Sequence, residues 1–114
     1  MIDNWTQEAA ARLALPLSEV PPTQRIAGSP RTGAESLGVF GGVNVGVWEM
    51  TPGTMRDTEV DEIFVVLHGA ATVAFEDRAP MTLSPGDVVR LHAGQRTVWT
   101  VTETLRKVYI SLRV

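Results

Sequence analysis

From Leu37 onward the chain is a series of short apolar and β-branched runs, each closed by turn-forming residues. The turns contain segments such as Gly41-Gly42, Thr51-Pro52-Gly53 and Ser84-Pro85-Gly86. Many short strands without intervening helices predict an all-β fold, an antiparallel sandwich or barrel. The runs read LGVF, VNVGVWEM, EIFVVLHG, ATVAFE, MTL, DVVRLH, RTVWTVTE and LRKVYISLRV.

The amino-terminal third has a different pattern. Asn4 is placed to cap a short helix over WTQEAAARLAL, with Trp5, Ala9 and Leu13 on one side. The following segment, PLSEVPPTQRIAGSPRTGAES, is dense in Pro, Gly and Ser and predicts an extended arm. We therefore expect a helix and arm over residues 1–36 and a β-barrel over residues 37–114, together one structural domain.

Composition excludes several classes of function. The chain has no cysteine, which removes disulfide frameworks, thiolate metal sites and cysteine nucleophiles. Its net charge of −3 is spread over interspersed acids and bases, so no basic surface for nucleic acid is expected. No apolar run is long enough to span a membrane, and the first residues lack the basic start of a secretion signal. These features predict a soluble cytoplasmic protein without nucleic-acid or membrane partners.

The run TMRDTEVDEIFVVLHG raises a question about Glu62. Read as one strand, it places Glu62 on the same side as Phe64 and Val66. A carboxylate on an apolar face needs a metal, a cation or donated hydrogen bonds. The opposite side of EIFVVLHG is also apolar, so we expect the arm or a second subunit to cover it, and we predict a homodimer.

These residues resemble the two motifs of the cupin fold. Glu62 and Gly69 match the end of the first motif, and Gly86 and Gly94 match the second. The chain is most similar to small single-domain cupins grouped with ureidoglycine aminohydrolase and ethanolamine-utilisation proteins. The resemblance implies a double-stranded β-helix, the cupin jelly-roll barrel, with Glu62 pointing inward.

The same resemblance implies that most of the usual metal ligands are missing. Counting back from Glu62, the two histidine positions hold Arg56 and Thr58 in one register and Met55 and Asp57 in the other. In the second motif, the proline, histidine and asparagine positions hold His92, Thr97 and Val101. We therefore expect no tightly held metal and no other cofactor, although a weakly bound divalent cation on Glu62 stays open.

Two explanations of the charge on Glu62 are open. Arg56 can enter the barrel and form a buried ion pair with Glu62, or Arg56 can point to solvent while Glu62 is hydrated at the barrel mouth. Glu59 and Asp61 fall on the opposite face from Glu62 if the strand is regular. The Arg106-Lys107 pair is interpreted as a solvated edge.

The candidate ligand-binding residues come from this inward face. No catalytic residue can be assigned, and three hypotheses follow: a barrel that binds a small polar metabolite without metal, a metal-dependent or Glu62–His92 enzyme acting on a small nitrogenous or carbonyl metabolite, and a non-catalytic structural dimer. The candidates are the polar side chains of Arg56, Thr58, Glu62, His92 and Thr97 and the walls Phe64, Val66, Trp99 and Trp48.

Overall fold

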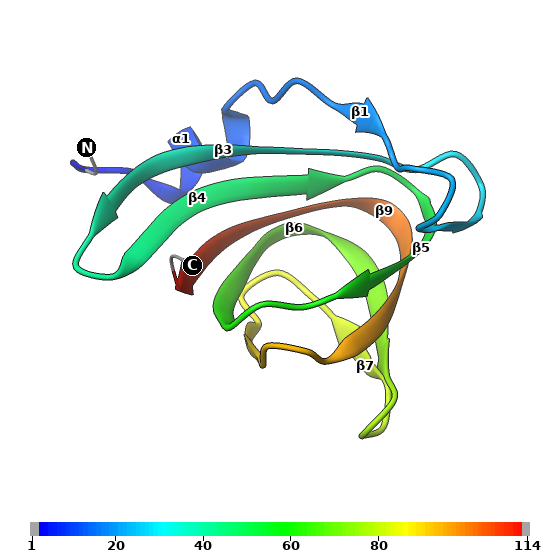
Figure 1. Ribbon diagram of the computed structural model, residues 1–114. Coiled ribbons are helices and arrows are strands. Elements are labelled where there is room, and N and C mark those ends of the chain that lie inside the picture. The colour runs from blue at the N-terminus through cyan, green and yellow to red at the C-terminus, as the bar shows by residue number, and fades with distance from the viewer. Residues whose placement is uncertain (1–2, 113–114) are drawn as a thin grey trace.

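The computed structural model describes residues 3–112 and confirms an all-β architecture with one short helix. Nine strands follow the helix, and Figure 1 shows them curling into a barrel under the layer formed by β3 and β4. The elements are α1 (Gln7–Arg12), β1 (Ser18–Glu19), β2 (Arg25–Ala27), β3 (Arg31–Phe40), β4 (Val43–Met50), β5 (Gly53–Thr58), β6 (Glu62–Phe75), β7 (Met81–Leu83), β8 (Val88–Leu91) and β9 (Arg96–Leu112).

Strand β9 organises the barrel. Its first half pairs with β5, its second half pairs with β4, and β6 runs antiparallel along its other edge. The other edge of β6 pairs with β7 and β8. Because β6 and β9 are long and twisted, the sheet closes around the side chains that alternate inward from them.

Two predicted strand breaks are wrong. The break at Gly69 is a bend inside β6, where three register shifts between Val66 and Ala71 interrupt the ladder with β9. Gly69 has a φ of +103°, and a Cβ there would lie 2.2 Å from the carbonyl oxygen of Thr104. RTVWTVTE and LRKVYISLRV likewise form the single strand β9, with residues 113–114 outside the described range.

The amino-terminal segment differs in detail from the prediction. The N-cap of α1 is Thr6, whose hydroxyl accepts a hydrogen bond from the backbone N–H of Ala9 at 3.0 Å, and not Asn4. Ala10, rather than Trp5, is the buried helical contact. The predicted arm contains β1 and β2, and β3 begins at Arg31, so this strand crosses the expected boundary at residue 36. The arm is thereby hydrogen-bonded into the sheet through β3 and β5.

The barrel interior holds the main hydrophobic core, in which Phe64, Leu91, Trp99 and Leu105 are almost fully buried. A smaller cluster lies outside the sheet, where Ala10 of α1 packs with Leu37, Val47 and partly buried neighbours. Within residues 3–112, no helix is long and apolar enough to cross a membrane.

Candidate functional site

Glu62 forms a buried ion pair with Lys107. The carboxylate Oε2 lies 2.8 Å from the Lys107 ammonium, and the two side chains are only 11% and 6% exposed. Lys107 comes from β9, where it pairs with Val66 of β6, four residues after Glu62 at the start of that strand. The interpretation of Lys107 as part of a solvated edge is therefore wrong, because its side chain points into the barrel. The burial of Arg106 contradicts the same interpretation.

Three aromatic rings surround the same ammonium. The Lys107 Nζ atom lies 4.7 Å from the ring centroid of Trp48, 4.3 Å from that of Phe64 and 4.9 Å from that of Trp99. Each ring presents the negative face of its quadrupole to the charge, and such contacts reach about 2 kcal/mol when they are desolvated. Glu62 and the three rings together hold a positive charge beside the hydrophobic core of the barrel.

Arg56 has no part in this pair. Met55 is buried and Asp57 is half-buried, whereas Arg56 and Thr58 are exposed. The inward residues of β5 are therefore those of the second register. Of the two explanations that the sequence left open, the ion pair between Arg56 and Glu62 is wrong; Arg56 is exposed, as the other explanation has it, but Glu62 is buried against Lys107. The cause lies between the strands: β5 ends at Thr58, and residues 59–61 leave the ladder before β6 begins.

The break between β5 and β6 also brings Glu59 inward. Its Oε2 accepts hydrogen bonds from the Thr97 hydroxyl at 2.7 Å and from the Trp99 indole N–H at 3.0 Å, and Glu59 is buried. The prediction that Glu59 lies on the face opposite Glu62 is thus wrong. Asp61 does lie at the surface, where hydrogen bonds from the Ala93 N–H and Arg90 lower the pKa of its carboxyl.

Asp57 is the least compensated carboxyl of the site. Burial and the nearby charge of Glu59 raise the pKa of Asp57 to about 6, against an opposing hydrogen bond from the Thr58 N–H at 2.8 Å. The Lys107 charge lowers this pKa and the Glu62 charge raises it, both to a smaller extent. Asp57 therefore changes its protonation state in the neutral range, where a side chain can both donate and accept protons.

These groups share a cavity of about 310 Å³. The size suits a small metabolite, and polar groups face an aromatic wall, as in many ligand sites. Burial and the charge of Glu62 raise the pKa of the Tyr109 phenol, which keeps the hydroxyl protonated at neutral pH. The lining residues are Ala34, Trp48, Asp57, Thr58, Glu59, Val60, Glu62, Trp99, Lys107 and Tyr109.

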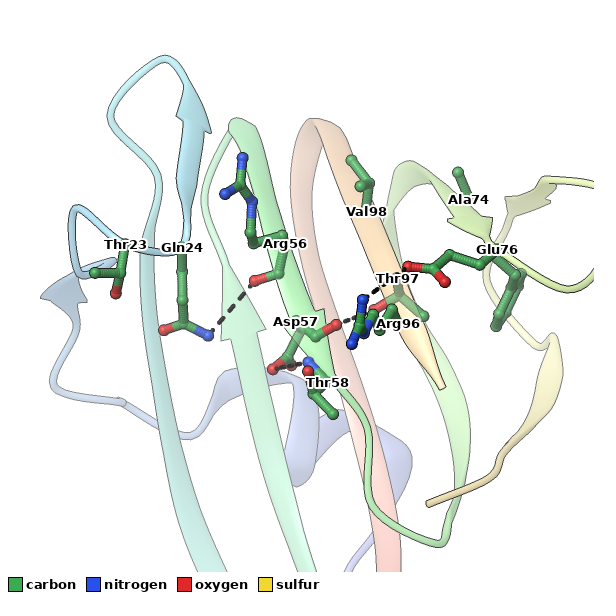
Figure 2. A pocket seen from close by; sticks show the side chains of 11 residues that line it. Thr23, Gln24, Arg56, Asp57, Thr58, Ala74, Glu76, Arg96, Thr97 and Val98 are labelled. Atoms are coloured by element: carbon green, nitrogen blue, oxygen red, sulfur yellow. Dashed lines mark hydrogen bonds and ion pairs between the residues drawn. The ribbon is translucent and has the colours of Figure 1, made fainter. Parts of the chain in front are cut away.

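A second pocket of about 670 Å³ adjoins the first and shares Asp57 and Thr58 with it (Figure 2). Arg56 lines this second pocket, and in Figure 2 its side chain points away from Asp57. Arg96 forms an exposed ion pair with Glu76 at its edge, with a separation of 3.7 Å.

The structure brings together only part of the predicted candidate set. Trp48, Thr58, Glu62 and Trp99 line the smaller cavity, and Phe64 contacts the Lys107 ammonium from the core side. The remaining candidates lie elsewhere: Thr97 behind Glu59, Val66 in the core, Arg56 in the second pocket and His92 in a third pocket formed with residues 76–78 and 93–96.

The residues present do not fit the metal centre that the cupin fold implies. Within residues 3–112, no group of three or more His, Cys, Asp or Glu side chains is arranged to hold a metal ion. The ammonium of Lys107 already lies on the one carboxylate, Glu62, that matches the family's ligand pattern. A divalent cation placed there would face a fixed positive charge.

Four polar lining residues are not among the predicted candidates: Asp57, Glu59, Lys107 and Tyr109. For Lys107 a signal was available, because the chain has nine arginines and this single lysine. For Glu59 there was none, since its orientation depends on how the chain leaves β5.

Comparison with known proteins adds the family context. The family model described as a EutQ-like cupin domain matches residues 37–109. No curated protein matches the chain. Several solved structures share its fold.

A Pseudomonas syringae pv. tomato protein of unknown function is 24% identical, with a TM-score of 0.73, and covers 87% of this chain. This chain spans only 44% of that protein. The Clostridium difficile EutQ protein is 21% identical over 83% of this chain and 80% of its own, with a TM-score of 0.63. A Rhizobium leguminosarum protein of unknown function is 19% identical over 100% and 99%, with a TM-score of 0.70. At these identities the likeness is one of fold.

Proposed function

This chain belongs to the EutQ-like cupin domain family, and we propose that it binds a small polar metabolite in the cavity beside Lys107, without a tightly held metal. In this proposal the Lys107 ammonium, held by Glu62, supplies the positive charge that a metal ion would otherwise supply. Binding is therefore organised by a charge that belongs to the chain itself.

The observation that carries this proposal is the position of the Lys107 ammonium. It is fixed by Glu62 and three aromatic rings, yet it lines the cavity. An ammonium has three N–H donors, and Glu62 accepts one of them. A ligand oxygen in the cavity is offered a positively charged donor in a fixed place, as it would be by a metal.

The charge of the cavity restricts the ligand. Asp57, Glu59 and Glu62 outnumber Lys107, so the ionised cavity has a net negative charge. An anionic ligand is repelled, and a neutral or cationic molecule is favoured. Asp57 is the carboxyl best able to accept a hydrogen bond from such a ligand, because its donor is the adjacent Thr58 backbone N–H, whereas Glu59 and Glu62 accept from side chains within the barrel.

A pair of cavity variants tests the location of binding. Ala34→Leu places a larger side chain in the proposed cavity, and Ala74→Leu does the same in the second pocket. Small neutral, cationic and anionic metabolites would be screened by thermal shift and ligand-observed NMR. We expect neutral or cationic ligands whose binding is lost in Ala34→Leu and kept in Ala74→Leu; the reverse pattern would move the site to the second pocket.

Metal analysis tests the proposal that the protein binds its ligand without a tightly held metal. The purified protein is expected to contain less than stoichiometric transition metal, and added Zn²⁺ or Mn²⁺ should leave its melting temperature unchanged. A stoichiometric metal that is lost in Glu62→Gln would refute metal-free binding and would favour the metal-dependent enzyme hypothesis.

A homodimer and a cytoplasmic location belong to the same proposal. The support for a dimer is the apolar outer face of the sheet, where Ile63 and Ile110 lie opposite each other and remain 42% and 38% exposed. The support for the location is the absence of cysteine.

A further inference from the structure

The choice of lysine at position 107 needs an explanation. At each of its nine other basic positions the chain uses arginine, and its one lysine lies buried in the barrel. A guanidinium pairs with a carboxylate through two hydrogen bonds and stays charged, so an ion pair alone does not require lysine. A primary amine adds one capacity that a guanidinium lacks under ordinary conditions: it can lose a proton and act as a nucleophile.

We propose that Lys107 forms an imine with a small aldehyde or ketone that enters the cavity, which makes a carbonyl compound the ligand of this site. The inference rests on the proposed function, since it needs the cavity beside Lys107 to be the binding site. It goes further in naming the chemical class of the ligand and the atom that bonds to it.

Glu62 is placed to start the reaction. Its carboxylate, 2.8 Å from Lys107 Nζ, accepts one ammonium proton and frees the nitrogen lone pair. The N–C bond forms as the carbonyl π bond breaks, the carbonyl oxygen takes up a proton from Asp57, and the nitrogen gives its second proton to Asp57, which leaves a neutral carbinolamine. The C–O bond then breaks as Glu62 returns the first proton to the hydroxyl group, water leaves, and the nitrogen keeps one hydrogen as a protonated imine. The ammonium and carbonyl compound have thus become an iminium ion and one water, with no change in total charge.

The surroundings of Lys107 stabilise both the reactant ammonium and the product iminium ion. Trp48, Phe64 and Trp99 present their faces to the nitrogen, and Glu62 supplies a negative charge. These interactions recognise a positive charge and stabilise the iminium ion as they stabilise the ammonium. The cavity therefore holds a cation before and after the bond forms, and its net charge is the same in both states.

Asp57 can provide the proton that the carbonyl oxygen takes up. It lines the same cavity, and its burial beside Glu59 keeps an appreciable protonated fraction near neutral pH. The Tyr109 hydroxyl also lines the cavity and is available to hydrogen-bond the carbonyl oxygen. Asp57 is thus assigned the role of general acid and Glu62 that of general base.

Reductive trapping gives a direct test, because the chain has one lysine. The protein would be incubated with propionaldehyde and cyanoborohydride, and the alkyl adduct at Lys107 would be followed by intact mass and peptide mapping. The same reaction in guanidinium chloride gives the rate for the unfolded chain, and the α-amino group serves as an internal reference. We expect Lys107 to react at least about tenfold faster in the folded chain than in the unfolded one, which is about 1.4 kcal/mol of activation free energy.

A Lys107 that is protected in the folded chain would contradict the proposal. A lysine buried only for structural reasons is protected, so slower trapping in the folded chain than in the unfolded chain would overturn the proposal. In Lys107→Arg, which keeps the charge, adducts are expected at the α-amino group alone. Asp57→Asn should lower the folded rate severalfold while leaving the unfolded rate unchanged, and the exposed control Glu103→Gln should alter neither.

A matched alcohol separates this inference from the proposed function. If the inference holds, propionaldehyde raises the melting temperature and 1-propanol does not, with the shift absent in Lys107→Arg. If other polar metabolites bind in the Ala34 cavity but no Lys107 adduct forms, the imine is refuted and the binding function stands. If Ala34→Leu leaves all binding unchanged, the proposed function itself fails.

Discussion

The Lys107 ammonium lies 2.8 Å from the Glu62 carboxylate, and both side chains are almost sealed from solvent. Breaking such a buried pair from one side leaves an uncompensated charge, which typically costs about 3–5 kcal/mol. We expect Glu62→Gln and Lys107→Met each to lower the free energy of unfolding by about this amount. The double variant should lose much less than the sum, because it leaves neither charge behind.

Urea unfolding of the four proteins measures this coupling. Arg56→Met is the matched control, since Arg56 is exposed and makes no ion pair with Glu62 among the described contacts; it should change stability by less than about 0.5 kcal/mol. Additive losses for Glu62 and Lys107 would show that the pair is not energetically coupled.

Asp57 should make the stability of the protein depend on pH. Its pKa rises from 3.8 to about 6 on folding, so the folded state binds more protons than the unfolded state between these values. Stability therefore falls as pH rises from below 3.8 to above about 6. Because Asp57 is partly exposed, solvent screening limits the loss to on the order of 1–2 kcal/mol.

Asp57→Asn removes this titration. We expect the variant to be as stable as the wild type at the acidic end of the window and more stable above it. The measurement is urea unfolding across the pH range, compared with Asp3→Asn as a control at an exposed position. A wild-type profile that rises with pH in parallel with that of Asp57→Asn would contradict the assignment.

Arg106 anchors helix α1 to the barrel. Its Nη1 donates to the backbone carbonyls of Ala10, Ala11 and Leu13, and its Nε donates to Glu49 at 2.8 Å. Arg106→Met removes these donors and leaves Glu49 unpaired, with an expected loss of about 3–5 kcal/mol.

The loss should also be local to the helix. Hydrogen exchange of the Ala10 amide is expected to accelerate in Arg106→Met before the barrel strands are affected. Arg12→Met is a suitable control, because the Arg12–Glu8 pair is exposed and such pairs contribute about 0.5 kcal/mol or less. If Arg106→Met and Arg12→Met accelerate hydrogen exchange and lower stability equally, Arg106 does not anchor the helix.

The exposed apolar face of β6 and β9 should mediate dimer formation. Ile63→Glu puts a charge next to Ile110 on this face and is expected to shift the protein toward monomer in light scattering at micromolar concentration. Thr100→Glu adds the same charge at an exposed position on another part of the sheet and should leave the dimer intact. A wild-type protein that is already monomeric would refute the dimer.

The barrel and the position of Glu62 in the site could be predicted, because the sequence patterns that indicate them lie within short stretches of the chain. Alternating apolar residues and spaced turns predict the all-β barrel, and the resemblance of Glu62 and the glycines that follow to the cupin motifs implies an inward carboxylate. The missing histidines predict that something other than a histidine-bound metal must offset that carboxylate. The sequence could not identify what does so, because Lys107 lies 45 residues further along the chain.

What the sequence by itself determined is therefore the fold class, the inward direction of Glu62 and the lack of the usual metal ligands. Tertiary structure alone decided the rest. Three residues between β5 and β6 are not paired in the ladder. As a result, Asp57 and not Arg56 lies on the inner face of β5, and Glu59 points inward. The antiparallel pairing of β6 with β9 then brings Lys107 to Glu62. The physical reason is that side chains alternate between the two faces of a strand with a period of two. One residue more or less in an irregular segment therefore moves every residue beyond it to the other face, and the sequence does not give the geometry of that segment.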